Sequence, residues 1–116
     1  MAYKDAMFST AAQYDALFKK TYDGYKNVPY QAAQASAAVQ VWKDAFERAQ
    51  SFDTEKVRDA LSATDMQSFY GNIKFSKAGN NVAKPMALRQ IQGGKYNVVA
   101  PAAFASHKVM HPRKAK

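Results

Sequence analysis

The segment from Tyr70 to Pro101 constrains the fold most, because its sequence, YGNIKFSKAGNNVAKPMALRQIQGGKYNVVAP, predicts short strands separated by glycine-marked turns. We expect three strands, over residues 69–75, 85–91 and 95–100. Apolar and polar side chains alternate in the first strand, a proline suits the start of the second, and a Gly-Gly pair is typical of a two-residue hairpin turn. A sheet this small has two unpaired edges. The sequence therefore predicts a partner for it, either another copy or more of the same polypeptide.

The chain before this segment is predicted to be helical. We expect helices over about residues 11–23, 31–50 and 54–62, the last with Asp53 as its N-cap. The second helix repeats apolar residues at intervals of three and four, and we expect these side chains to form its buried face: Ala35, Ala38, Val39, Trp42, Ala45, Phe46 and Ala49. Three helices followed by strands are α+β by segment order.

Composition excludes several classes of site and partner. With 116 residues, 47% of them hydrophobic, the chain can form one domain with a buried core. The absence of cysteine excludes disulfides, thiolate metal sites and cysteine nucleophiles. A net charge of +8 would suit nucleic acid, but lysine and arginine are spread along the chain and cluster only at Lys19-Lys20 and at residues 113–116. We therefore expect no nucleic-acid partner.

Residues that could carry catalysis or hold a metal are scarce. His107 and His111 have the i, i+4 spacing of a metal-binding pair, but no carboxylate lies near them in the sequence and Pro112 interrupts the segment. The sequence lacks a nucleophile elbow and a glycine-rich phosphate loop, and its carboxylates fall on solvated helix faces or at helix starts. We therefore expect no enzyme, no bound metal and no cofactor.

Tyr30 is the aromatic residue that packing explains least. It follows Pro29 at the start of the second predicted helix, where backbone N–H groups have no partner within the helix. Such a helix N-terminus suits the carboxylate of a small zwitterion, although most helices begin near a similar arrangement.

Several motifs occur in a fixed order along the chain. Residues 53–61, DTEKVRDAL, fit a pattern D-x-x-x-V-R-x-A-L in which the fourth position is often lysine. Residues 71–79, GNIKFSKAG, fit the pattern G-x-I-x-F-x-x-x-G. The Gly-Gly hairpin and a V-V-x-P segment at residues 98–101 follow. Together these motifs resemble the C-terminal third of the type 1 periplasmic solute-binding proteins, the branched-chain amino acid and amide receptors of bacterial ABC transporters. The likeness extends over about residues 12–101.

The resemblance implies an incomplete α/β fold of that family, with three helices followed by about three short strands that include a hairpin. Residues 1–116 would then be a single C-terminal segment of a two-lobed protein, and residues 102–116 a basic, partly disordered tail. Because half of the cleft would be missing, we do not expect this segment to have the full binding ability of the complete receptor. In the family the solute lies between the lobes, binding closes them, and the membrane permease recognises the closed form. The resemblance places ligand contacts at Tyr30, Gln31 and Gln34, for an amino acid or amide-like solute.

The chain departs from the family pattern in two places. Residues 35–38 are Ala-Ser-Ala-Ala where the family often has G-Y-D-A, which could alter ligand preference, and Ser76 replaces a frequent aspartate. The resemblance implies a periplasmic parent protein, although the first residues, MAYKDAMFSTAAQ, lack the pattern of a secretory signal.

The sequence leaves a second function open. A small basic interaction domain could associate with its own copies through unpaired strand edges and form a homo-oligomer. Such a protein would assemble as its concentration rises and without any solute, which distinguishes it from a receptor segment.

Overall fold

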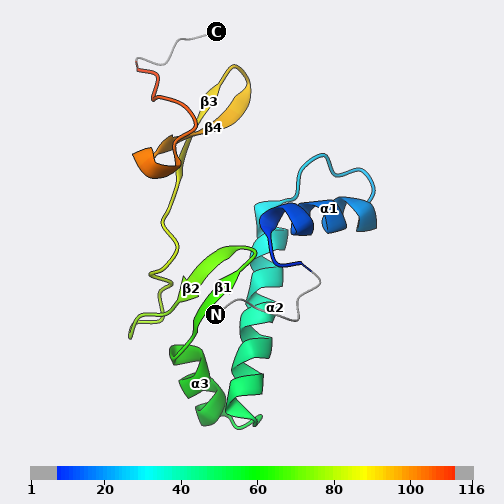
Figure 1. Cartoon of the computed structure of the whole chain (residues 1–116), viewed down its shortest axis with the longest axis vertical. Helices are drawn as coiled ribbons and strands as arrows, with labels where there is room; N and C mark the ends of the chain where they lie inside the picture. Colours follow the sequence, from blue (N-terminus) through cyan, green and yellow to red (C-terminus); the bar gives the residue numbers. More distant parts are fainter. Residues whose placement is uncertain (1–7, 112–116) are drawn as a thin grey trace. The chain divides into compact units, whose positions relative to one another are not determined.

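The computed structural model describes residues 8–111, which fall into two compact units divided between Lys84 and Pro85 (Figure 1). The first unit holds helices α1 (Ala11–Thr21), α2 (Tyr30–Ala49) and α3 (Thr54–Ser62) and strands β1 (Asp65–Ser68) and β2 (Gly71–Lys74). The second unit holds strands β3 (Leu88–Gln92) and β4 (Lys95–Ala100) and the short 3-10 helix η1 (Ala102–Phe104). Three helices and four strands in two small antiparallel sheets, within the described residues, confirm the predicted mixed fold class.

Helix α1 is fixed at one end by a cap and along one side by aromatic packing. The Thr10 side chain accepts a hydrogen bond from the Gln13 backbone N–H at 3.2 Å, as expected of an N-cap. Tyr14 is the buried residue of the helix, and its ring stacks on Phe69 with a centroid distance of 4.4 Å. The Tyr14 hydroxyl also lies 3.0 Å from the Ser36 hydroxyl of α2. Together these contacts hold α1 against α2 and the turn between β1 and β2.

Helix α2 buries a face that has only Ala45 in common with the predicted one. Its buried residues are Ala37, Gln40, Val41 and Ala45. Val39 and Trp42, which the sequence placed in the core, are 68% and 48% exposed. The prediction was wrong because α2 carries two apolar stripes, and the β1–β2 hairpin covers only the stripe that contains Ala37 and Val41.

Helix α3 starts at the predicted cap and is tied to α2. Asp53 accepts a hydrogen bond from the Lys56 backbone N–H at 3.1 Å. The Arg48 guanidinium, from the last turn of α2, donates to the Ala60 carbonyl at 2.6 Å and to the Thr64 hydroxyl at 3.0 Å. These bonds join the ends of the two helices, and α3 then leads directly into β1.

The first hairpin differs from the single strand predicted over residues 69–75. Strands β1 and β2 pair antiparallel, with Met66 opposite Ile73, and Phe69 and Tyr70 form the turn between them. The Ser68 hydroxyl closes this turn, because it donates to the Gly71 carbonyl at 2.9 Å and accepts from the Tyr70 N–H at 3.1 Å. Strand β1 was missed because its inward positions pair an apolar Met66 with a polar Ser68, which obscures the alternation.

The second hairpin follows the prediction closely. Gly93 and Gly94 both have positive φ angles, 59° and 76°, as a type I′ turn requires. Strand β4 occupies the predicted range, whereas β3 begins at Leu88 instead of Pro85. The Gln90 side chain pairs with the backbone of Met110, donating at 2.9 Å and accepting at 2.9 Å. Part of the predicted tail is thus held on the hairpin, and residues 112–116 lie outside the described residues.

Candidate functional site

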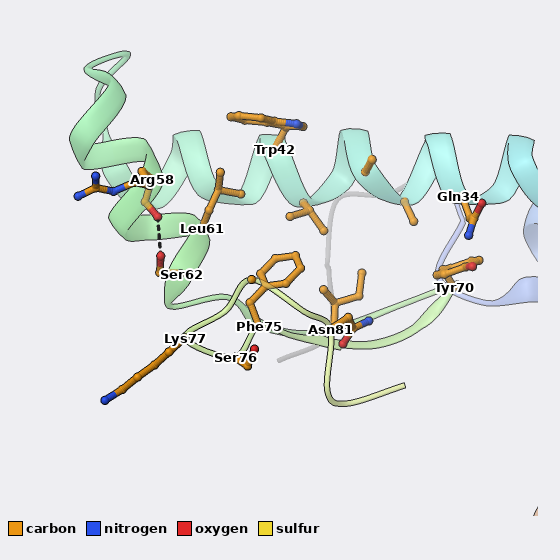
Figure 2. Close-up of a pocket in the computed structure, with 15 residues that line it drawn as sticks. Gln34, Trp42, Arg58, Leu61, Ser62, Tyr70, Phe75, Ser76, Lys77 and Asn81 are labelled. Atoms are coloured by element: carbon orange, nitrogen blue, oxygen red, sulfur yellow. Dashed lines mark hydrogen bonds between the residues drawn. The ribbon is translucent and has the colours of Figure 1, made fainter. Parts of the chain in front are cut away.

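A groove of about 500 Å³ opens in the first unit between α2, α3 and the β1–β2 hairpin (Figure 2). Its floor is apolar, formed by Val41 of α2 and Ile73 of β2, which are 7% and 5% exposed. Leu61 of α3 and Phe75 beyond β2 extend the apolar surface, and both pack against the cluster that contains Val41 and Ile73. This volume lies within the range of about 300–1,000 Å³ typical of small-molecule sites.

The groove exists because α2 presents small side chains where a larger one would fill the space. Ala37 and Ala38 both line it, one turn before Val41 and Trp42. An alanine leaves the gap between helix and hairpin open, whereas a leucine or phenylalanine at position 38 would extend into it. The alanine-rich start of α2 therefore has a packing consequence beyond its helix propensity.

The loop after β2 forms a fixed wall of the groove. The Asn81 side-chain oxygen accepts hydrogen bonds from the backbone N–H groups of Lys74 and Ala83, both at 3.1 Å. Its amide nitrogen donates to the Asn72 carbonyl at 3.3 Å. Asn81 thus ties the loop to the open side of β2 and keeps that side of the groove in place.

One end of the groove carries uncharged hydrogen-bonding groups. Gln34 of α2 is directed toward the Tyr70 ring at the hairpin turn (Figure 2). Within residues 8–111, neither the Gln34 amide nor the Tyr70 hydroxyl has a hydrogen-bond partner. The Tyr70 ring is itself held, because the Lys84 ammonium lies 3.0 Å from its centroid.

The charged residues that line the groove, within the described part of the chain, are two cations, Arg58 and Lys77. Among the described residues that line it, none is a carboxylate. Arg58 lines one end but is paired with Glu55 at 2.7 Å and Asp59 at 3.3 Å on its own helix. The Lys77 side chain extends away from the groove (Figure 2). The lining therefore suits a ligand with an apolar body and offers no counter-charge to an ammonium group.

The three residues predicted from the sequence fall in two environments. Gln34 lines the groove, while Tyr30, 60% exposed, and Gln31, also exposed, lie at the first turn of α2 and are not among its lining residues. No side chain caps this end of α2, whose N-cap is Pro29. The first-turn N–H groups suit an anion, and the role of Tyr30 and Gln31 stays a prediction.

Sequence reasoning missed most of the groove. Tyr70, Ile73 and Phe75 were assigned to a half-buried strand, and Trp42 to the core of α2. The residue types carry no signal that separates a groove wall from a core, because the difference depends on how α2 and the hairpin are packed. The one available signal was the run of small residues at positions 35–38, which permits an open space beside the helix.

Two further findings concern the described residues as a whole. Over residues 8–111, no helix combines the length and apolarity required to cross a bilayer. The same residues contain no cluster of three or more histidine, cysteine or acidic side chains placed to hold a metal ion.

A match to a known family covers most of the chain. Residues 1–95 match the family described as periplasmic binding protein. The matched range includes α1, α2, α3, the β1–β2 hairpin and β3, and it contains every residue that lines the groove.

Proposed function

Because this chain belongs to the type 1 periplasmic binding protein family, we propose that it takes part in recognising an amino acid or amide-like solute for an ABC transporter. Members of the family generally bind small-molecule solutes in the periplasm and do not convert them chemically. The family match over residues 1–95 carries the proposal, and the groove beside α2 is the proposed location of the solute. Its mechanism is recognition, with no bond made or broken.

The proposed ligand contacts begin at the N-terminus of α2. Tyr30 and Gln31 offer an exposed ring and amide beside uncapped backbone N–H groups, and Gln34 lies one turn further along, at the groove. An anionic or polar end of the solute at the helix N-terminus is favoured by the helix dipole. The apolar part of the solute then lies over Val41 and Ile73.

The chain is proposed to act as the C-terminal segment of a larger two-lobed receptor, with residues 102–116 as a basic tail. Exposed apolar side chains support this view, because Val39, Trp42 and Phe52 are 68%, 48% and 89% exposed. A second lobe would cover such a surface and complete the solute site. Recognition by a membrane permease would then belong to the closed form of the complete receptor.

A calorimetric titration tests the proposal. The purified chain is titrated at two protein concentrations with branched-chain, polar and aromatic amino acids and with short amides. Saturable binding of one class supports solute recognition by this chain. Heat changes no larger than dilution for every solute, in a chain that is folded by circular dichroism, would contradict solute binding by this chain alone.

The contribution of Tyr30 has its own test. Tyr30→Ala should weaken solute binding in the complete receptor by about fivefold, because a lost aromatic contact or hydrogen bond is worth about 1 kcal/mol. The melting temperature should change little, since Tyr30 is 60% exposed. Tyr22→Ala, at an exposed ring outside α2, serves as the control. Equal affinity in the Tyr30 variant and the wild type would remove Tyr30 from the site.

Self-association through strand edges is the second candidate function. Both sheets among residues 8–111 have only two strands, so each has edges that no strand of the described chain covers. Sedimentation velocity across a wide range of protein concentration tests it. Concentration-dependent assembly without solute favours this function, and a constant monomer excludes it.

A further inference from the structure

Acidic and basic residues are distributed differently along the chain. All nine aspartates and glutamates lie at or before Asp65, whereas nine of the 17 lysines and arginines follow it. The second unit, which begins at Pro85, therefore has no carboxylate side chain in its sequence, although it contains Arg89, Lys95 and Lys108. Such a separation of charge along a chain is typical of a segment that meets an anionic partner.

The cations of the second unit are not neutralised by the described part of the protein. Within residues 8–111, no ion pair involves Arg89, Lys95 or Lys108, and all three residues are exposed. The Arg89 guanidinium lies 5.1 Å from the centroid of the Tyr96 ring, a contact that leaves its charge without a counter-ion. An anionic surface can therefore approach these cations without displacing a carboxylate.

The segment after η1 covers one face of the β3–β4 hairpin. The Gln90 side chain exchanges two hydrogen bonds with the Met110 backbone, and the Gln92 amide donates to the Lys108 carbonyl at 2.8 Å. Gln90 and Gln92 are two residues apart and so lie on the same face of β3. Figure 1 shows this segment returning alongside the hairpin, so that face is covered by the chain itself.

The opposite face of the hairpin carries cationic, apolar and aromatic side chains together. Arg89 pairs with Val98, and Ile91 pairs with Tyr96, across the two strands. Because residues directly opposite each other share a face, these four residues form one open face. On it Ile91 is 54% exposed and Tyr96 is 70% exposed. Val98 and Tyr96 lie beyond residue 95, where the family match ends.

A bilayer that contains anionic lipid matches this mixture of side chains better than a nucleic acid does. Tyrosine is enriched where lipid meets water, aliphatic side chains gain free energy by entering the acyl boundary, and each lysine or arginine near an anionic membrane adds attraction. Single-stranded nucleic acid instead requires aromatic rings on which bases stack. The large apolar residues exposed along β3 and just before it are aliphatic: Met86, Leu88 and Ile91.

We infer that the β3–β4 hairpin docks on the surface of a bilayer that contains anionic lipid. Ile91 and Tyr96 lie at the acyl boundary, and Arg89 and Lys95 meet the lipid phosphates. This contact goes beyond solute recognition, because no residue of the groove takes part in it. Its failure would therefore leave the proposed function standing, and the failure of solute binding would leave the membrane contact standing.

Vesicle binding by the full chain tests the inference. A co-sedimentation assay compares vesicles of pure phosphatidylcholine with vesicles of phosphatidylcholine and phosphatidylglycerol in equal parts. Binding to the anionic vesicles should be about tenfold tighter or more, and it should weaken as salt is added, because salt screens the attraction. Equal binding to both kinds of vesicle, or binding to neither, would overturn the inference.

Two other polyanions identify the class of partner. A single-stranded oligonucleotide and polyglutamate are compared with the anionic vesicles at equal concentrations of anionic groups. The vesicles should bind most tightly, since only they offer an apolar phase to Ile91. Tighter binding of the oligonucleotide would overturn the inference in favour of nucleic acid, and tighter binding of polyglutamate would overturn it in favour of an acidic protein.

Two double variants separate the hairpin from net charge. Arg89→Gln with Lys95→Gln should weaken binding to anionic vesicles by about twentyfold, since each cation near the surface contributes about fivefold. Lys20→Gln with Lys26→Gln removes the same charge from exposed positions in the first unit and should weaken binding by less than about twofold. Equal losses in the two double variants would show that net charge, and not the hairpin, drives binding, and would overturn the inference.

A tryptophan placed on the open face reports whether that face enters the lipid. In a Trp42→Phe background, which removes the single natural tryptophan, Ile91→Trp should shift its emission to shorter wavelength when anionic vesicles are added. Phe52→Trp in the same background is the control, at an 89% exposed position in the first unit, and its emission should not shift. Unshifted emission from Ile91→Trp while the protein sediments with the vesicles would overturn the inference.

Discussion

Two neighbouring residues on α2 differ in burial, and the smaller one is the more buried. Val41 is 7% exposed and contacts Met66 and Ile73, whereas the Trp42 ring is 48% exposed and stacks on Phe46 at a centroid distance of 5.5 Å. We predict that Val41→Ala lowers the free energy of unfolding by about 2 kcal/mol, through lost burial and a new cavity. Trp42→Ala should cost about 1 kcal/mol, because the side chain is already 48% exposed in the folded protein. Urea denaturation of both variants measures the difference. A loss of about 3 kcal/mol or more for Trp42→Ala would contradict this prediction and would show that Trp42 is a core residue.

Asp65 provides a prediction about pH. A hydrogen bond from the Lys74 ammonium at 2.6 Å, together with its charge, lowers the pKa of the Asp65 carboxyl. Because the folded pKa is lowered, this contact stabilises the fold above the usual aspartate pKa of about 3.9 and is lost as pH falls through the lowered value. An NMR titration should show the Asp65 pKa rising in Lys74→Met. The same pKa in the variant and the wild type would contradict this account.

Some single-residue roles could be predicted from the sequence and others could not. Asp53 as the cap of α3 and the Gly-Gly turn before β4 were predicted because cap and hairpin signals are local and depend on few neighbours. The burial of Val41 instead of Trp42 could not be predicted, because both belong to apolar stripes of the same helix. Only the position of the hairpin decides which stripe is covered.

At the scale of elements, the α2–α3 corner depends on Arg48. Its guanidinium joins Asp44 on its own helix at 2.7 Å to the Ala60 carbonyl and the Thr64 hydroxyl. We predict that Arg48→Met lowers the free energy of unfolding by about 1–2 kcal/mol, because Thr64 is almost fully buried and would lose a charged partner. Arg58→Met is the control, since its ion pairs lie within α3 and are exposed, and it should cost less than about 0.5 kcal/mol. Equal losses in thermal or urea unfolding would show that Arg48 does not couple the helices.

The helices and strands around the groove were predicted from the sequence only in part. Helix α3 and strand β4 have the bounds that were predicted. The β1–β2 hairpin was read as one strand, because Ser68 faces inward where an apolar residue was expected. Since this hairpin forms one side of the groove, the site could not be assembled from the sequence, although Gln34 within it was named.

At the scale of the whole molecule, family membership and the groove give one account. The family match covers the first 95 residues, and the residues that line the groove all lie within it. The apolar residues left exposed on α2 and at Phe52 fit a segment that packs against further protein. The central claim is that this chain receives a solute in the groove beside α2.

Trp42 allows that claim to be tested directly. It is the single tryptophan of the chain and it lines the groove, so its fluorescence reports on the occupancy of the groove. The measurement is a titration of the full chain with the amino acids and short amides of the calorimetric titration, followed by tryptophan emission, alongside Ala38→Phe as the blocked control. The account predicts a saturable change in emission that follows the calorimetric binding curve and is lost in the control. Emission that stays unchanged while calorimetry shows binding would place the solute outside the groove and contradict the claim.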